Sequence, residues 1–136
     1  LKNLDLNINY ENQSLNFNHS KVALDDILSI KLRDSKFINT RKKQYFIGEF
    51  EIDINNYSNL YTFFQTKKEF RKEMNSINLF IKYDFFSDDL SIEKLKIDGK
   101  STESARGILE QFNQEENPIR NRIDLRNFFN SVIEEL

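Results

Sequence analysis

The sequence contains no cysteine and a single histidine, His19. A disulfide framework, thiolate metal sites, thiol catalysis and multi-histidine metal centres are therefore excluded. Glycine is scarce as well: Gly48, Gly99 and Gly107 stand far apart, so the chain has no glycine-rich phosphate loop. No apolar run approaches the roughly 20 residues of a membrane-spanning helix, and no signal-peptide pattern is present. The central residues of most known enzyme active sites are therefore missing from this sequence.

Charge of neither sign dominates the chain. There are 20 Lys and Arg residues against 22 Asp and Glu residues, which gives a net charge of -2 and a pI of about 5.5. A dedicated nucleic-acid binder carries a basic surplus. We therefore expect no nucleic-acid partner.

The 136 residues supply enough material for one domain, and a hydrophobic content of 38% is typical of a chain that folds. Because the first residue is Leu1 and not methionine, we expect a fragment with an upstream part missing. Residues 1–136 are interpreted as a single domain or fragment. Residues 1–100 form its sheet, and residues 101–136 form a two-helix C-terminal segment.

Apolar and polar residues alternate over most of the first hundred positions, which predicts strands with one apolar face. A hairpin is expected around the turn at residues 11–13, followed by strands near residues 28–33 and 45–54. Gly48 marks a bulge or a close approach within the longer strand. Two further strands are expected at 77–83 and 90–97, and a shift of phase at Glu93-Lys94 predicts a β-bulge there.

Helical spacing replaces the alternation in three places. Tyr57, Leu60, Tyr61 and Phe64 fall at i, i+3, i+4 and i+7, which predicts a short helix near residues 57–65. Towards the end of the chain, Ser101 and Asp124 are expected to cap two further helices. The predicted fold is α+β: a curved antiparallel β-sheet with a short inserted helix and two C-terminal helices packing on its apolar face or end.

Candidate catalytic residues are few. His19 lies near Asp25 and Asp26, which suggests a small hydrolase, but no nucleophile-elbow sequence accompanies it, and a surface turn residue is the preferred interpretation. The carboxylate pairs Asp25-Asp26 and Asp88-Asp89 both flank expected turns. We expect a non-enzymatic protein with no catalytic residue, no cofactor and no metal.

The aromatic content is more informative, because the chain has 13 phenylalanines and no tryptophan. A one-sided apolar sheet can be ordinary core or can line a groove for an acyl chain, as apolar pockets do. The candidates for such a lining share one strand face: Phe46, Phe50, Ile52, Ile54, Leu79, Ile81, Leu95 and Ile97. Two basic clusters, at residues 41–43 and 67–72, are interpreted as solvated loops, or, if they bind at all, as sites for lipid headgroups.

A family resemblance adds to these patterns. Residues 46–53, 60–65, 77–83 and 95–100, with Lys67, Lys68 and Arg71, resemble the C-terminal region of AsmA-like proteins of AT-rich Gram-negative bacteria. Residues 121–130 resemble the two-helix ending of the same proteins. The likeness covers roughly residues 45–130. It rests on strand spacing and aromatic positions, and it includes no catalytic signature.

What the resemblance implies is lipid transport. AsmA-like proteins belong to the bridge-like lipid-transfer superfamily. They are anchored in the inner membrane by an N-terminal helix and project into the periplasm, where a long β-sheet forms an apolar groove linked to phospholipid movement and outer-membrane biogenesis. We expect the anchor and most of the groove to belong to the missing upstream part.

Two hypotheses of different classes follow. In the first, the chain is a periplasmic AsmA-like C-terminal segment whose partners are phospholipid acyl chains, the inner membrane through the missing anchor, and a periplasmic or outer-membrane protein. In the second, it is a non-catalytic structural or protein-interaction module. Its apolar sheet face is then ordinary core, and an exposed edge strand docks another chain.

Overall fold

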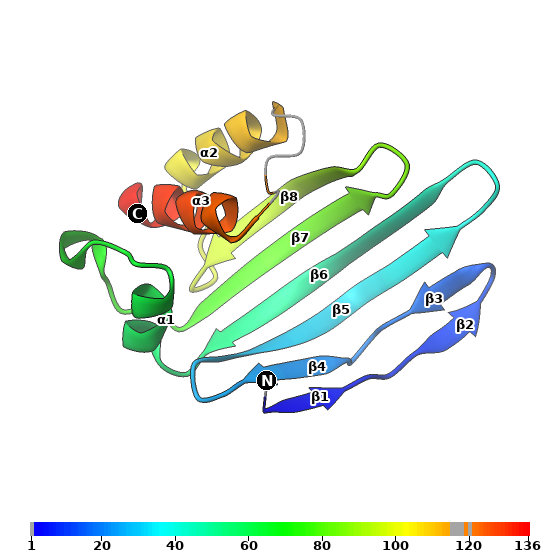
Figure 1. The fold of residues 1–136 in the computed structure, drawn as a ribbon, viewed down its shortest axis with the longest axis horizontal. Helices are drawn as coiled ribbons and strands as arrows, with labels where there is room; N and C mark the ends of the chain where they lie inside the picture. The colour runs from blue at the N-terminus through cyan, green and yellow to red at the C-terminus, as the bar shows by residue number, and fades with distance from the viewer. Residues whose placement is uncertain (1, 115–118, 120) are drawn as a thin grey trace.

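The computed structural model describes residues 2–114, 119 and 121–136, and this part of the chain folds as an open antiparallel sheet of eight strands with helices on one face (Figure 1). The α+β prediction is confirmed. The elements are β1 (Asn3–Asp5), β2 (Asn9–Glu11), β3 (Ser14–Asn16), β4 (Lys21–Leu24), β5 (Leu28–Asn39), β6 (Gln44–Ile54), α1 (Tyr57–Phe63), the 3-10 helix η1 (Lys68–Phe70), β7 (Ser76–Asp84), β8 (Asp89–Ile97), α2 (Glu103–Gln114) and α3 (Arg122–Glu134).

The sheet is a meander in the order β1-β4-β5-β6-β7-β8, and the β2–β3 hairpin continues it beside the second half of β5. Strand β5 therefore pairs with β4 near its start, through Lys31 and Lys21, and with β3 near its end, through Ile38 and Ser14. The hairpin turn expected at residues 11–13 is present, with Asn12 and Gln13 at φ values of 51° and 63°. Left-handed values at both positions suit a tight hairpin turn.

Both irregularities expected in the strands are present. Phe80 pairs with Lys94 and Ile81 with Ile92, so Glu93 is the extra residue of a β-bulge. Gly48 is a point of close approach, because a Cβ atom on it would lie 2.2 Å from Ser35 Oγ. Ser35 itself belongs to the bulged part of β5, since the register shifts between Arg33 and Lys36 opposite this glycine.

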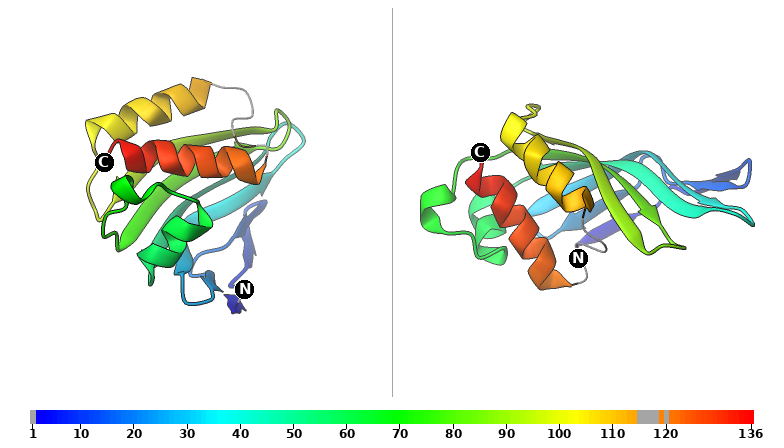
Figure 2. Two further views of the ribbon diagram at one scale, coloured as in Figure 1. Left: turned by 60° about the vertical axis from the view of Figure 1, so that its left-hand side comes forward. Right: turned by 90° about the horizontal axis from the view of Figure 1, so that it is seen from above.

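The helices form a second layer over only part of the sheet (Figures 1 and 2). Helix α2 packs against β8, and α3 packs against α2. Buried side chains of the helices and of the rest of the chain that packs against them form the core: Ile54, Leu60, Tyr61, Met74, Ile77, Ile92, Leu95, Ala105, Leu109, Phe112, Val132 and Ile133. The long ends of β5, β6 and β7 extend beyond the helices.

The helix caps differ from those expected. Thr102, and not Ser101, accepts the Ala105 N–H through Oγ1 at 3.0 Å. Asn121, and not Asp124, caps α3, because its Oδ1 accepts the Ile123 N–H at 2.7 Å and the Asp124 N–H at 3.1 Å. Asn121 precedes α3 in an extended conformation, whereas Asp124 already lies within the helix.

Candidate functional site

The two faces of the sheet differ in chemistry. Residues paired directly across neighbouring antiparallel strands point to the same face. Phe46 pairs with both Phe37 and Tyr83, and Phe50 pairs with both Leu32 and Leu79. One face therefore carries an apolar row across β5, β6 and β7, and the helices lie on this same face, which we call the apolar face.

The helical layer covers most of the residues expected to line a groove. Ile54 and Leu95 are 9% and 5% exposed and belong to the core. Four others are partly buried and pack against that core: Ile52, Leu79, Ile81 and Ile97. These six side chains share the expected face, but the helices close over them. They contribute to the core or pack against it.

Phe46 and Phe50, the remaining two, lie beyond the helices in a group of rings. Phe46 is 6.2 Å from Phe17 and 6.0 Å from Phe50 between ring centroids. Phe85 is 5.3 Å from Phe37 and 4.7 Å from Tyr83, both edge to face. We call these six residues the aromatic cluster: Phe17, Phe37, Phe46, Phe50, Tyr83 and Phe85. None of them packs against the core beneath the helices.

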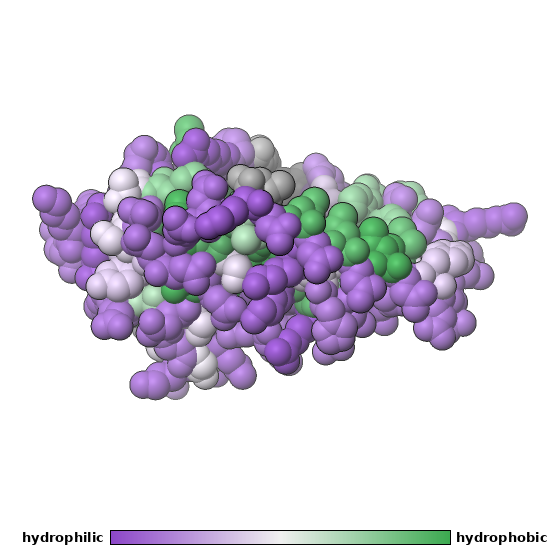
Figure 3. Space-filling view, turned by 90° about the horizontal axis from the view of Figure 1, so that it is seen from below, coloured by the Kyte–Doolittle hydropathy of each residue, from purple (hydrophilic) through white to green (hydrophobic). Residues whose placement is uncertain are grey.

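The aromatic cluster is only partly shielded from solvent. Phe17, which follows β3, and the members in β5, β6 and β7 are half-buried, and Phe85 is 46% exposed in the turn that follows β7. Figure 3 shows hydrophobic residues continuing to the right of the helical layer on this side of the molecule. Tyr83 donates a hydrogen bond to Asp88, which raises the pKa of its phenol and fixes the β7–β8 turn beside the cluster.

The opposite face is charged. Lys31 Nζ lies 3.0 Å from Asp53 Oδ2, and Arg33 Nε lies 2.7 Å from Glu51 Oε2, so ion pairs link β5 to β6 there. Two aromatic side chains also lie on this face, but lysines cover them: Lys82 stands over Tyr45 at 5.7 Å and Lys94 over Phe80 at 5.9 Å. Apolar side chains of β5, β6 and β7 are thus concentrated on the face that carries the helices.

The residues considered for catalysis and metal binding are not assembled into a site. His19 and Asp25 are exposed turn residues with φ values of 66° and 47°, and within the described residues no hydrogen bond joins their side chains. Among residues 2–114, 119 and 121–136, no group of three His, Cys, Asp or Glu side chains is placed to hold a metal ion. None of the described helices is both long and apolar enough to cross a membrane.

The two basic clusters lie at opposite ends of the sheet. Residues 41–43 form the β5–β6 turn, whereas residues 67–72 surround η1 beside α1 (Figure 1). Lys67 stands over the Phe70 ring at 5.7 Å, and Arg71 Nε donates to the Thr66 carbonyl at 2.9 Å. The two basic clusters therefore do not form one continuous basic surface.

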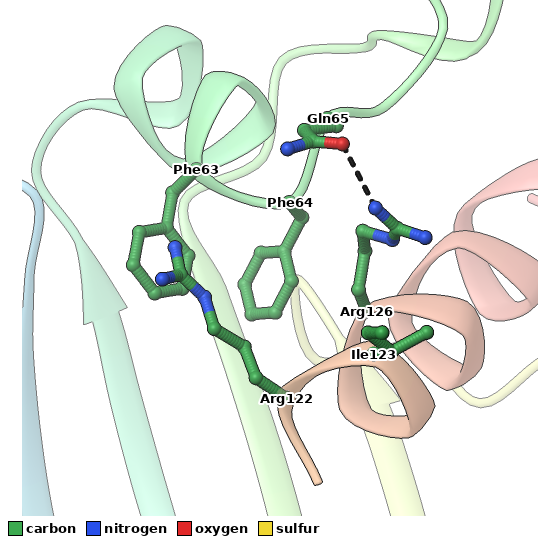
Figure 4. A pocket seen from close by; sticks show the side chains of 6 residues that line it. All are labelled: Phe63, Phe64, Gln65, Arg122, Ile123 and Arg126. Atoms are coloured by element: carbon green, nitrogen blue, oxygen red, sulfur yellow. Dashed lines mark hydrogen bonds between the residues drawn. The ribbon is translucent and has the colours of Figure 1, made fainter.

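A cavity of about 230 Å³ opens between the end of α1 and the start of α3 (Figure 4). Its wall consists of Phe63, Phe64, Gln65, Arg122, Ile123 and Arg126, and we call it the arginine pocket. The sequence analysis did not identify it. One signal was available, because Arg122 and Arg126 are four residues apart and so share one face of a helix.

No protein-family model, curated protein or solved structure matches this chain.

Proposed function

We propose that the chain is the C-terminal part of an AsmA-like periplasmic protein and contributes an apolar surface to a groove for phospholipid transfer in outer-membrane biogenesis. The observation that carries the proposal is the aromatic cluster, which continues the apolar face beyond the helices. Extended apolar patches of this kind on a folded protein mark binding surfaces.

The arrangement suits an acyl chain. Strand β6 has 11 residues, and its part from Gln44 to Phe50 corresponds to about 20 Å at a rise of about 3.3 Å per residue. A stretch of an extended acyl chain can therefore lie along this part and bury apolar surface against alternate side chains, at about 25 cal/mol per Å². The charged opposite face stays in water. Transfer of this kind needs no catalytic group.

The positions of the eight candidate residues reduce the number of them that can form the lipid surface. Only Phe46 and Phe50 of the eight are free of the helical layer, so the lipid surface consists of these two with the neighbouring rings Phe17, Phe37 and Tyr83. The other six stabilise the fold. In the proposed protein the groove ends at the helical layer, and the uncovered part of the sheet forms part of the groove.

The proposal is tested by lipid binding to two neighbouring single variants. Phe46 and Ile47 are consecutive half-buried residues of β6 that point to opposite faces. Phe46→Asn should weaken binding of a fluorescent phospholipid, whereas Ile47→Asn should leave it unchanged. Thermal unfolding of both variants checks that each is folded. Equal binding by both variants would contradict the proposal.

One observation favours the second hypothesis, a protein-interaction module. Strands β1 and β2 form an edge of the sheet, and Leu4 and Tyr10 on them are 49% and 69% exposed. An edge strand can accept a strand from another chain through its free backbone groups. A proline substitution at Asn3, Leu4 or Asp5 that abolished partner binding and left lipid binding intact would support that function.

A further inference from the structure

The arginine pocket combines aromatic and cationic walls. The Arg122 guanidinium lies 4.6 Å from the Phe63 ring centroid, and Arg126 Nη1 donates to Gln65 Oε1 at 2.8 Å. Phe64 stacks on Phe129 at 4.1 Å, which fixes the ring between the two arginines (Figure 4). Both guanidinium groups are thus oriented by neutral partners.

Among the described residues, no acid forms an ion pair with either guanidinium, and no carboxylate lines the pocket. A guanidinium has five N–H donors, and within this part of the chain those of Arg122 and Arg126 are largely unused. The pocket therefore presents positive charge and free donors next to exposed aromatic surface.

The position of the pocket relates it to the apolar face. Helix α3 lies on that face, and its first turn, which carries Arg122, is the end nearer the uncovered part of the sheet (Figures 1 and 2). Phe63 and Ile123 at the pocket are 48% and 58% exposed. An anionic group in the pocket could thus be attached to an apolar body outside it.

We propose that the arginine pocket binds the phosphate ester of a phospholipid headgroup, an inference that rests on the proposed function. Planar guanidinium groups match phosphate oxygens with paired hydrogen bonds, which a lysine ammonium cannot do. Phe63 and Phe64 contact the first apolar atoms of the ligand. The pocket then holds the headgroup at the border of the helical layer, and the aromatic cluster takes the acyl chains.

The experiment compares soluble ligands that separate the contribution of the phosphate ester from that of the acyl chains. Calorimetry measures binding of dihexanoyl phosphatidylglycerol, of dihexanoylglycerol with the same acyl chains and no phosphate, of glycerol 3-phosphate, and of inorganic phosphate. The proteins are the unchanged chain, Arg122→Gln, Arg126→Gln and the control Arg106→Gln on α2. Arg106 is also an exposed helical arginine but lies outside the pocket.

The unchanged chain should prefer the phospholipid to dihexanoylglycerol. Each pocket variant should weaken phospholipid binding about tenfold, with no change for dihexanoylglycerol, and Arg106→Gln should change neither. A preference for phospholipid that survives in both pocket variants would overturn the inference alone. Inorganic phosphate binding as tightly as the phospholipid would overturn the assignment to a lipid. Failure of both acyl ligands to bind would overturn the proposed function together with the inference.

Discussion

Ser35 lies directly over Gly48, so closely that a Cβ atom on the glycine would stand 2.2 Å from Ser35 Oγ and 2.7 Å from Ser35 Cβ. The contact is possible because β5 carries one extra residue between Arg33 and Lys36, opposite this glycine. Ser35 is fully buried, and its hydroxyl donates to the Arg33 carbonyl at 2.8 Å. The two residues thus hold β5 close to β6 at the bulge.

Gly48→Ala should destabilise the protein by about 1–3 kcal/mol, because the new methyl group overpacks a closed site. The measurement is the free energy of unfolding in urea. Gly107→Ala is the matched control: no atom lies within 4 Å of its added Cβ, and removing a helical glycine should stabilise α2 by about 1 kcal/mol. Adding Ser35→Gly to Gly48→Ala should restore part of the loss, and an additive double variant would contradict the contact.

The buried phenol of Tyr61 leads us to predict a loss of stability at alkaline pH. Burial raises the pKa of its phenol, and its hydroxyl donates to the Lys72 carbonyl at 2.8 Å. The unfolded phenol ionises near pH 10, whereas the folded one keeps its proton to higher pH, so stability falls as pH rises above about 10.

Tyr61→Phe should cost about 1–2 kcal/mol at pH 8, because the hydroxyl loses the hydrogen bond it donates to the Lys72 carbonyl and the one it accepts from the Lys72 N–H. The variant should then lose less stability than the unchanged chain as the pH rises above about 10. Part of the alkaline slope should remain, since the raised pKa of Tyr83 acts in the same direction. Identical slopes in the two proteins would contradict the assignment to Tyr61.

Asn113 joins α2 to the bulge of β8 with two hydrogen bonds. Its Nδ2 donates to the Ile92 carbonyl at 2.8 Å, and its Oδ1 accepts the Ile92 N–H at 2.9 Å, as a neighbouring strand would. Asn113→Asp keeps the acceptor but sets a carboxylate oxygen against the carbonyl. We expect a loss of about 1–3 kcal/mol in the free energy of unfolding. Glu110→Gln, an exposed change on the same helix, should have no effect.

Much of the sheet could be predicted from the sequence because apolar and polar residues alternate along most of its long strands. The sequence indicates the bulge at Glu93 because the apolar alternation changes phase between Ile92 and Leu95. Without the extra residue, one of these two side chains would point to solvent. The residues that cap the helices were harder to predict. Ser101 and Thr102 are adjacent hydroxyl residues, and only backbone geometry decides which of them caps α2.

The division of the apolar face could not be predicted. Phe46, Phe50, Ile52 and Ile54 continue one alternation along β6, and nothing in that pattern separates the covered residues from the uncovered ones. The helical layer decides this through contacts between distant parts of the chain. The arginine pocket has the same origin, because Arg122 meets Phe63 only when α3 packs beside α1.

The central claim is that the aromatic cluster is a lipid surface, and site-specific photo-crosslinking in cells with labelled phospholipid tests it most directly. The probe is placed at Phe46 and Phe50 on the uncovered apolar face, at Glu49 and Glu51 on the opposite face, and at Leu95 beneath the helices. We predict that labelled lipid is captured at positions 46 and 50 and not at the other three. Equal capture on both faces, or no capture at 46 and 50, would contradict the account.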